Sequence, residues 1–291
     1  MTKGQPPAQT VKGQILSYAA IQDIGGRADQ EDRFLVYDMV TGDGQPAVLA
    51  LIADGIGGHN QGQTASEMAR HNVPAHLAAQ APRSGVEVGH ALRSALEETC
   101  RDIYEASLAD PSREGMGTTC TAIVVVERRL YLAHVGDTRA YLMRGDQLRQ
   151  LSIDHTWAEE AIRAGFPVED IRKHPNRGVL RRYLGVEPTV EVDTRCRLAG
   201  NQDETQDTLV DGPLELAPGD VLMLCTDGLA DLVEEPDMLP ALQSGNLGHA
   251  ATALVQSALQ AGATDNVTVV VLRLAGGKTA GLRSWLSGLQ R

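Results

Sequence analysis

Aspartates recur at the ends of apolar segments that have the composition of buried strands. Asp54, Asp137 and Asp227 each follow such a segment, and Asp265 stands just before another. A single Asp-Gly pair in this position usually forms a turn, because both residues tolerate turn dihedral angles. Four carboxylates gathered at one end of a sheet would repel one another unless a cation neutralised them. The pattern therefore indicates a site for divalent cations.

The residue types favour Mg²⁺ or Mn²⁺ over Zn²⁺, because hard cations take oxygen ligands and no His or Cys cluster accompanies the aspartates. Two such ions about 3.5 to 4 Å apart can lower the pKa of a bridging water and aim it at a phosphoryl group. The expected chemistry is hydrolysis of a phosphate ester. A guanidinium suited to the phosphate oxygens is available at Arg27, which is close in sequence to Glu31 and Asp32.

Seven short motifs resemble, in their order and spacing, those of the metal-dependent type 2C Ser/Thr protein phosphatases, the PPM family, in its bacterial form. The resemblance extends over residues 27–271. The motifs are Arg27-x-x-Gln30-Glu31-Asp32, Asp54-Gly55-Ile56-Gly57-Gly58-His59, Gly117-Thr118-Thr119, Gly136-Asp137-Thr138-Arg139, Asp154-His155-Thr156, Thr226-Asp227-Gly228-Leu229 and Asp265-Asn266-Val267-Thr268.

The resemblance implies an α+β fold, a four-layer αββα sandwich of two antiparallel sheets flanked by paired helices, with a flap subdomain at about 156–182. The residue patterns agree, since they indicate hairpins rather than regular alternation of strands and helices. Continuous apolar runs predict strands, and apolar spacings of three and four predict helices. The expected strands are 47–53, 120–126, 130–135, 140–144, 147–151, 221–226 and 266–274, and the expected helices are 62–80, 86–108 and 247–259.

We expect one phosphatase domain over residues 13–275. Residues 1–12 are polar and without periodicity, which predicts a flexible leader, and the polar, acidic stretch 201–211 is predicted to be an exposed loop. Leucine and tryptophan recur at helical spacing in the tail, 276–291, which predicts a short amphipathic helix. That helix would pack on its own domain or dock on a partner or membrane surface.

The family pattern assigns a role to each acid of the core site. By this resemblance, Asp54 bridges two metal ions and the carbonyl of Gly55 binds one of them. Asp227 and Asp265 complete the protein's share of the second ion. The implied cofactors are two Mn²⁺ or Mg²⁺ ions.

Further residues match more peripheral positions of the family. Glu31 and Asp32 match residues that hold metal-bound water, although a solvated acidic turn is the alternative. Arg27 matches the arginine that binds the substrate phosphate, and its alternative is a surface ion pair. Asp137 and Asp231 match the ligands of a third, weaker metal, although an aspartate in the position of Asp231 is also stabilised by a helix dipole alone.

Two features leave the mechanism incomplete. Ile56 stands where some family members have a histidine that serves as general acid, so that role is unassigned, with His59 or a water as candidates. Thr118 and Thr119 suit a strand and are assigned to the fold rather than to chemistry. The flap is locally basic and is expected either to hold a phosphoprotein or to be an ordinary solvated face; its cations are Arg163, Arg172, Lys173, Arg177, Arg181 and Arg182.

Composition excludes several other classes of protein. The chain has 26 Lys and Arg against 38 Asp and Glu, a net charge of −12, and 3% aromatic residues, which argues against a nucleic-acid partner. Its four cysteines form no Cys-x-x-Cys pair, and no apolar run reaches the roughly 18 residues of a membrane span. The N-terminal residues also lack a secretory signal. We therefore expect a cytoplasmic monomer without an integral membrane segment.

Together these observations predict a metal-dependent phosphatase that hydrolyses phosphoserine and phosphothreonine by direct attack of a metal-activated water. Its partners would be phosphorylated proteins and a cognate Ser/Thr kinase. One alternative is a non-catalytic pseudophosphatase that binds a signalling partner, which would lack metal acids that are all present here. A two-metal phosphodiesterase or nuclease is a further alternative, disfavoured by the charge.

Overall fold

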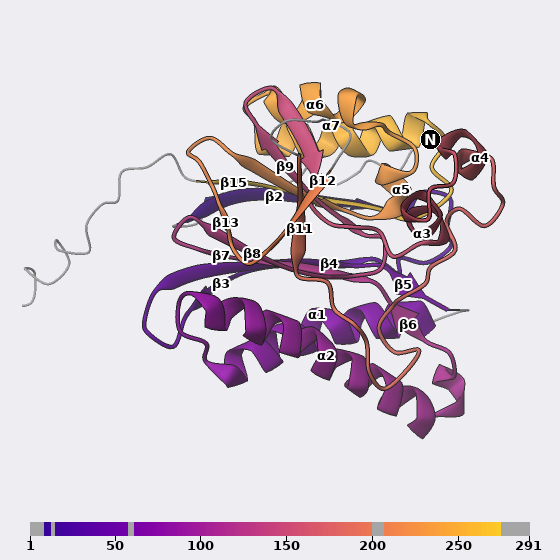
Figure 1. Ribbon diagram of the computed structural model, residues 1–291, viewed down its shortest axis with the longest axis horizontal. Helices are drawn as coiled ribbons and strands as arrows, with labels where there is room; N and C mark the ends of the chain where they lie inside the picture. The colour runs from indigo at the N-terminus through magenta and orange to yellow at the C-terminus, as the bar shows by residue number, and fades with distance from the viewer. Residues whose placement is uncertain (1–8, 13–14, 58–60, 200–206, 275–291) are drawn as a thin grey trace, which may run out of the picture.

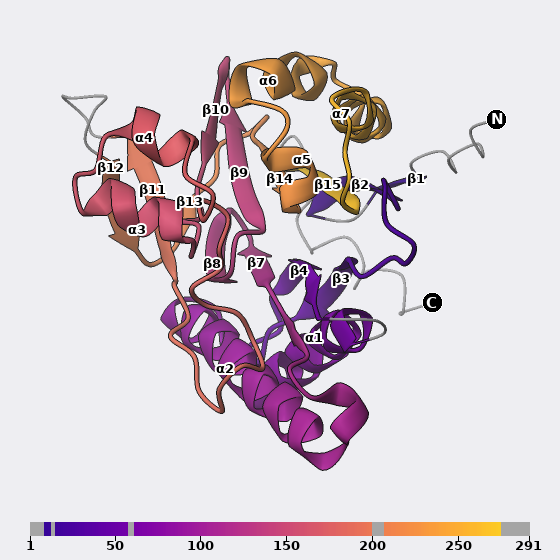
Figure 2. The same cartoon turned by 90° about the vertical axis from the view of Figure 1, so that its right-hand side faces the viewer.

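The computed structural model describes residues 9–12, 15–57, 61–199 and 207–274. Two antiparallel sheets lie face to face, and a pair of helices covers the outer face of each (Figure 1). The view at 90° shows the flap helices beside the sandwich (Figure 2). The four-layer αββα arrangement predicted from the sequence is therefore confirmed.

The five-stranded sheet has the order β13-β8-β7-β4-β3. Helices α1 (Gln61–Gln80) and α2 (Val86–Ala109) cover it. Its strands are β3 (Arg33–Val40), β4 (Pro46–Ala53), β7 (Cys120–Val126), β8 (Arg129–Val135) and β13 (Leu214–Glu215).

The six-stranded sheet has the order β1-β2-β15-β14-β9-β10. Helices α6 (Glu235–Gln243) and α7 (Leu247–Gln260) cover it. Its strands are β1 (Gln9–Lys12), β2 (Leu16–Asp23), β9 (Arg139–Arg144), β10 (Gln147–Gln150), β14 (Val221–Cys225) and β15 (Val267–Leu274).

Smaller elements complete the fold around one end and one side of the sandwich. Two short ribbons pair β5 with β6 and β11 with β12. The flap contains α3 and α4, and a single helical turn, α5, follows β14. The bounds are β5 (Gly55–Ile56), β6 (Gly117–Thr118), β11 (Arg195–Ala199), β12 (Asp207–Asp211), α3 (Trp157–Arg163), α4 (Val168–Arg172), α5 (Asp227–Ala230) and the 3₁₀ turn Pro111–Arg113.

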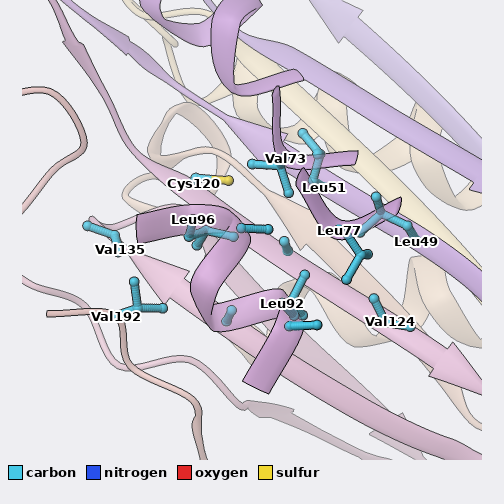
Figure 3. Close-up of a cluster of buried hydrophobic side chains, with 14 of the residues drawn as sticks. Leu49, Leu51, Val73, Leu77, Leu92, Leu96, Cys120, Val124, Val135 and Val192 are labelled. Carbon is cyan, nitrogen blue, oxygen red and sulfur yellow. The ribbon is translucent and has the colours of Figure 1, made fainter. Parts of the chain in front are cut away.

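The central strands are apolar on both faces because both faces are covered. In β7 every residue is buried: its alternate side chains pack under α1 and α2 and between the two sheets. Figure 3 shows the first of these clusters, in which Leu49 and Leu51 of β4 lie near Leu77 and Val73 of α1, and which also contains Leu92 and Leu96 of α2. This double burial explains why continuous apolar runs, rather than alternating patterns, identified the strands.

Antiparallel pairing brings the acid-bearing ends of the strands to one end of the sandwich. In one sheet, the end of β4 lies beside the start of β3, where Ala53 pairs with Arg33. In the other, Cys225 at the end of β14 lies beside Val269, near the start of β15. The last residue of β8, Val135, pairs with the first of β7. Segments distant in sequence therefore converge at this end.

Two expectations from the sequence are wrong in part. The predicted loop 201–211 contains β12, whose Asp211 pairs with Arg195 of β11; β12 is short and has no apolar alternation, so its composition resembled that of a loop. The expected leader, 1–12, is wrong for its last four residues, because Gln9–Lys12 forms β1 and pairs with β2. The predicted tail helix, 276–291, lies outside the described residues.

Strands β2 and β3 and helix α6 are among the elements that the sequence patterns did not predict. Strands β2 and β3 precede the first expected strand, and their polar residues interrupt the apolar run. Helix α6 contains Pro236 and Pro240, yet its Met238 and Leu242 are buried against the core. Among the described residues, no helix is both long and apolar enough to cross a membrane.

Replacement of a buried leucine should test the helix–sheet layer. We expect Leu92→Ala, at a fully buried position of α2, to lower the free energy of unfolding by about 2 to 5 kcal/mol through lost packing and a cavity. Leu108→Ala, near the end of the same helix and 69% exposed, is the matched control and should cost less than about 0.5 kcal/mol. Urea unfolding measures both; equal losses would contradict this packing.

Candidate metal and phosphate site

Asp54 is the first residue after β4, and two threonines fix its backbone. Its N–H donates to Thr119 Oγ1 at 3.0 Å, and its carbonyl oxygen accepts from Thr118 Oγ1 at 2.8 Å. The Thr119 N–H also donates to that carbonyl at 2.9 Å. The assignment of the threonines to the fold was incomplete, because their hydroxyls determine where the Asp54 backbone lies.

The chain after Asp54 runs against the first turn of α1 at glycine positions. A Cβ atom on Gly55 would lie 2.2 Å from the carbonyl oxygen of Gly62, a distance that no side chain allows. A similar contact occurs after β14, where a Cβ on Gly228 would lie 2.0 Å from the Asn266 carbonyl oxygen. The two backbones can meet at each place only because Gly55 and Gly228 have no side chain.

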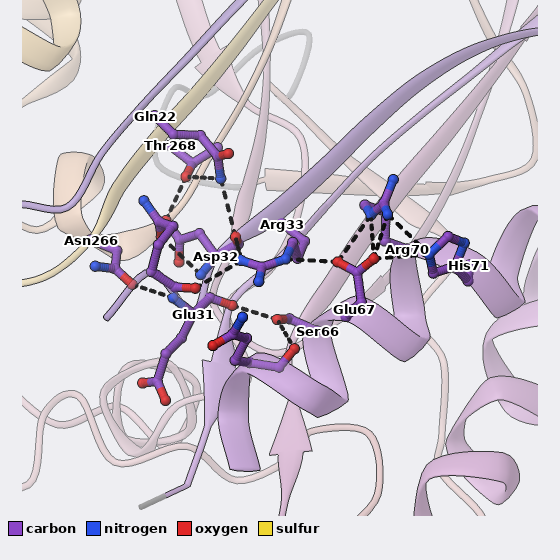
Figure 4. Close-up of polar contacts among 12 residues, drawn as sticks. Gln22, Glu31, Asp32, Arg33, Ser66, Glu67, Arg70, His71, Asn266 and Thr268 are labelled. Carbon is purple, nitrogen blue, oxygen red and sulfur yellow. Dashed lines mark hydrogen bonds and ion pairs between the residues drawn. The ribbon is translucent and has the colours of Figure 1, made fainter. Parts of the chain in front are cut away.

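Asp32 is fully buried and joins the two sheets. Its Oδ2 accepts hydrogen bonds from Thr226 at 3.0 Å and Thr268 at 2.6 Å, while its Oδ1 has no hydrogen-bond partner in the part of the chain that the structure describes. Burial raises the pKa of Asp32 to about 7, against the opposing effect of the two threonine hydroxyls. Figure 4 shows Asp32 between Thr268 and the neighbouring Arg33.

Three further aspartates lie close to Asp32 and are partly buried. Burial raises the pKa of Asp54 well above its usual value, and the charges of Asp32, Asp227 and Asp137 add to the effect. Burial raises the pKa of Asp227 to about 6, although a hydrogen bond with the Asp54 carboxyl opposes it. The pKa of Asp137 is raised for the same reasons, burial first and then Asp227. These acids are close enough to resist simultaneous ionisation.

Asp265 has a basic partner. The Arg27 guanidinium lies 2.5 Å from its Oδ2, with 51% of the arginine side chain exposed. The Asn266 side chain holds the same loop: its amide N–H groups donate to the carbonyls of Ile24 and Asp29, and its Oδ1 accepts from the Glu31 N–H. The segment with Arg27 and Glu31 is thereby fixed at the edge of the acidic cluster.

Asp231 lies farther out than the other acids. It follows α5, has a half-exposed side chain, and lies 3.5 Å from the Arg139 guanidinium, which binds Asp154 more closely at 2.7 Å. Burial raises the pKa of Asp231, while Arg139 and Arg177 of the flap lower it. The flap is therefore next to the acidic end of the sandwich. His59 lies outside the described residues.

The donor chemistry fits hard divalent cations. Asp32 Oδ1 and Asp227 Oδ1 are buried oxygens that have no hydrogen-bond partner among the described residues. In the described part of the chain, no three His, Cys, Asp or Glu side chains form a group that could hold an ion by themselves. Mg²⁺ commonly keeps several waters and takes only one or two carboxylates, so a compact triad is not needed. These unpaired carboxylate oxygens and the repulsion among the neighbouring carboxylates would both be satisfied by a bound cation.

The structure brings most of the sequence-predicted residues into one region and adds others. Asp32, Asp54, Asp137, Asp227 and Asp265 interact through their charges, and Arg27 and Glu31 stand at the rim. Sequence reasoning missed the polar residues that hold them. All belong to the quoted motifs, which is the signal that could have found them: Thr118, Thr119, Thr226, Asn266 and Thr268.

Known proteins share this sequence pattern. The family described as Protein phosphatase 2C matches residues 28–261. The serine/threonine phosphatase stp of Listeria monocytogenes is 35% identical to this chain over 233 residues, which cover 79% of this chain and 85% of that protein.

Solved structures share the fold. The Mycobacterium tuberculosis serine/threonine phosphatase PstP/Ppp has 35% identity and a TM-score of 0.70, covering 89% of this chain and 99% of that one. The catalytic domain of PstP in complex with two manganese ions has 34% identity and a TM-score of 0.67, covering 90% and 99%. The family predicted from the motifs is confirmed: the chain belongs to the protein phosphatase 2C family.

Proposed function

We propose that this protein is a metal-dependent serine/threonine protein phosphatase. The observation that carries the proposal is the group of buried and partly buried aspartates at one end of the sandwich, with an arginine at its edge. Two of its oxygens have no hydrogen-bond partner among the described residues. Such a group is costly to bury without a cation and suits phosphate-ester hydrolysis once a cation is bound. Relatives named as serine/threonine phosphatases support the substrate class.

Asp54, Asp227, Asp265 and the Gly55 carbonyl would hold two Mn²⁺ or Mg²⁺ ions, as in the family pattern. When bound, these ions supply an activated water and offset the charge of the phosphoryl group. The structure of the PstP catalytic domain in complex with two manganese ions supports a pair of metal ions. Asp137 and Asp231 would hold a third, weaker ion.

The remaining residues would orient the substrate and the water. Arg27 is half exposed, so its guanidinium can reach a phosphate from solvent while its Nη2 stays near Asp265. Asp32 has one oxygen fixed by two threonines and the other free to accept a hydrogen bond. Glu31 lies beside the backbone of Gly62, where it can hold water at the rim.

A phosphorylated protein would approach past the flap. Three of the six flap cations are paired with carboxylates, namely Arg163, Arg181 and Arg182. Arg172, Lys173 and Arg177 would attract an acidic phosphosegment. A Ser/Thr kinase would supply the substrate, and the four buried free thiols suit a reducing cytoplasm.

Removal of metal or of a ligand should abolish turnover. We expect purified protein to hydrolyse a phosphothreonine peptide with Mn²⁺ and not with EDTA, because the carboxylates alone provide no activated water. Asp54→Asn and Asp227→Asn should each lower kcat by more than about 100-fold, since losing a residue that only supports a metal ligand already costs about 10- to 100-fold. Peptide hydrolysis measured by phosphate release checks both.

The matched control is Asp146→Asn, an exposed aspartate in the turn between β9 and β10, which should keep wild-type kcat. Circular dichroism should show that all variants are folded. Turnover that persists in EDTA, or in Asp54→Asn, would contradict the proposal. Faster hydrolysis of bis-p-nitrophenyl phosphate than of the peptide would identify a phosphodiesterase instead.

The metal-free protein should lose stability as pH rises from 6.5 to 8. The folded-state pKa of Asp32 is raised to about 7, so its stabilising contribution is complete below the unfolded value near 4 and is lost as pH rises through 7. Asp54 and Asp137, whose pKa values are also raised, act in the same direction. His134 and His155 have lowered pKa values and act in the opposite direction only below about 6.5.

Thermal unfolding in EDTA at pH 6.5, 7 and 8 measures this dependence. The melting temperature should fall from pH 6.5 to pH 8. The fall should be smaller in Asp32→Asn, and smaller also when Mn²⁺ replaces EDTA, because the cation neutralises the cluster. A melting temperature that rises with pH in EDTA would show that these carboxylates are not raised in pKa.

A further inference from the structure

Arg33 directly follows Glu31 and Asp32 in the sequence, and its side chain makes three hydrogen bonds. Its Nη1 donates to the carbonyl oxygens of Gln30 at 2.8 Å and Asp32 at 2.7 Å, and its Nε donates to Glu67 Oε2 at 2.7 Å. The arginine side chain is only 18% exposed. One guanidinium therefore ties the loop that carries Glu31 and Asp32 to helix α1 (Figure 4).

Helix α1 holds the same loop at a second point. Ser66, the residue before Glu67, donates its hydroxyl to the Glu31 carbonyl at 2.5 Å. Two adjacent residues of α1 therefore hold the backbone of Glu31 and Asp32. Ser66 does so directly, and Glu67 does so through Arg33. A shift of this helix turn would move Glu31 and Asp32 together.

Glu67 is itself held in place on the helix surface. Arg70 binds its carboxylate from one turn farther along α1, and His71 Nε2 lies 2.8 Å from Oε1. The hydrogen bonds from Arg70 and then Arg33 lower the pKa of Glu67 to about 2, despite partial burial. Glu67 is therefore ionised throughout the neutral and mildly acidic pH range.

We propose that Arg33 and Glu67 are positioning residues, which set the cation affinity of the site by fixing the backbone of Glu31 and Asp32. This inference rests on the proposed function, because it concerns the same cations. The Asp32 side chain is bound on one oxygen only, so the direction of its free Oδ1 depends on where the backbone lies. Arg33 fixes that backbone at the Asp32 carbonyl itself.

The geometry needs a guanidinium and not merely a positive charge. Arg33 uses Nη1 for two carbonyls and Nε for the carboxylate, so its contacts come from different nitrogens of a rigid plane. A lysine has a single ammonium group and cannot reach the loop carbonyls and Glu67 with the same geometry. Arg33→Lys therefore keeps the charge and removes the bridge.

The test measures Mn²⁺ binding by isothermal titration calorimetry on metal-stripped protein, alongside peptide hydrolysis. Arg33→Lys and Glu67→Gln should each weaken Mn²⁺ binding about 10-fold or more. They should raise the Mn²⁺ concentration for half-maximal activity by a similar factor, with a smaller change in the KM for peptide. Arg101→Lys is the matched control, because it makes the same exchange at an exposed position of α2 outside this network; its Mn²⁺ affinity should stay within about twofold.

A charge exchange separates positioning from simple ion pairing. The double variant Arg33→Glu, Glu67→Arg restores opposite charges at the two positions. Its Mn²⁺ affinity should nevertheless stay low, because a glutamate side chain at position 33 has no N–H for the loop carbonyls. Recovery of wild-type affinity in this double variant would overturn the positioning role. Thermal unfolding in EDTA should show that Arg33→Lys and Glu67→Gln remain folded.

The two proposals fail in different ways. Unchanged Mn²⁺ affinity in both Arg33→Lys and Glu67→Gln, with an active wild type, would overturn this inference alone. A wild type that neither binds Mn²⁺ nor hydrolyses the peptide would overturn the proposed function together with it.

Discussion

Mutual repulsion among buried carboxylates is the constraint on which this structure depends. Asp32, Asp54, Asp137 and Asp227 lie in one desolvated region, where the charges of neighbouring acids add to the effect of burial on their pKa values. Burial of like charges costs stability unless protons or cations offset it. Other parts of the fold must therefore offset the free-energy cost of keeping these acids together. Most of this stabilisation comes from burial of apolar side chains in the three hydrophobic clusters of the sandwich.

The acids come from both sheets, so the packing between the sheets sets their separation. Asp54 extends from β4 of one sheet, while Asp227 and Asp265 flank β14 and β15 of the other. Asp32 joins the two halves, because it precedes β3 and accepts hydrogen bonds from Thr226 and Thr268. Loosening of the layer between the sheets would therefore change the site as well as the core.

Sequence patterns predicted the parts of this protein in which local composition reflects burial. β7 and α2 were recognised because apolar residues face covered surfaces along their length. β12 was not, since its pairing with β11 depends on backbone hydrogen bonds that leave no mark in composition. The acids could be predicted from their residue type and their position at strand ends. The contacts of Asn266 and Arg33 could not, because they join residues that are distant in the sequence and meet only in the folded protein.

The polar contacts that hold the acids in place are of two kinds, neutral and charged. Threonine hydroxyls and the Asn266 amide fix backbone and one carboxylate oxygen without adding charge. Arg27 and Arg139 do add charge, and each binds an acid at the edge of the cluster: Arg27 binds Asp265, a proposed metal ligand, and Arg139 binds Asp154. A guanidinium bound among the central carboxylates would neutralise them permanently and exclude other cations. Neutral donors at the centre and arginines at the edge therefore leave the central carboxylate oxygens available to a divalent cation.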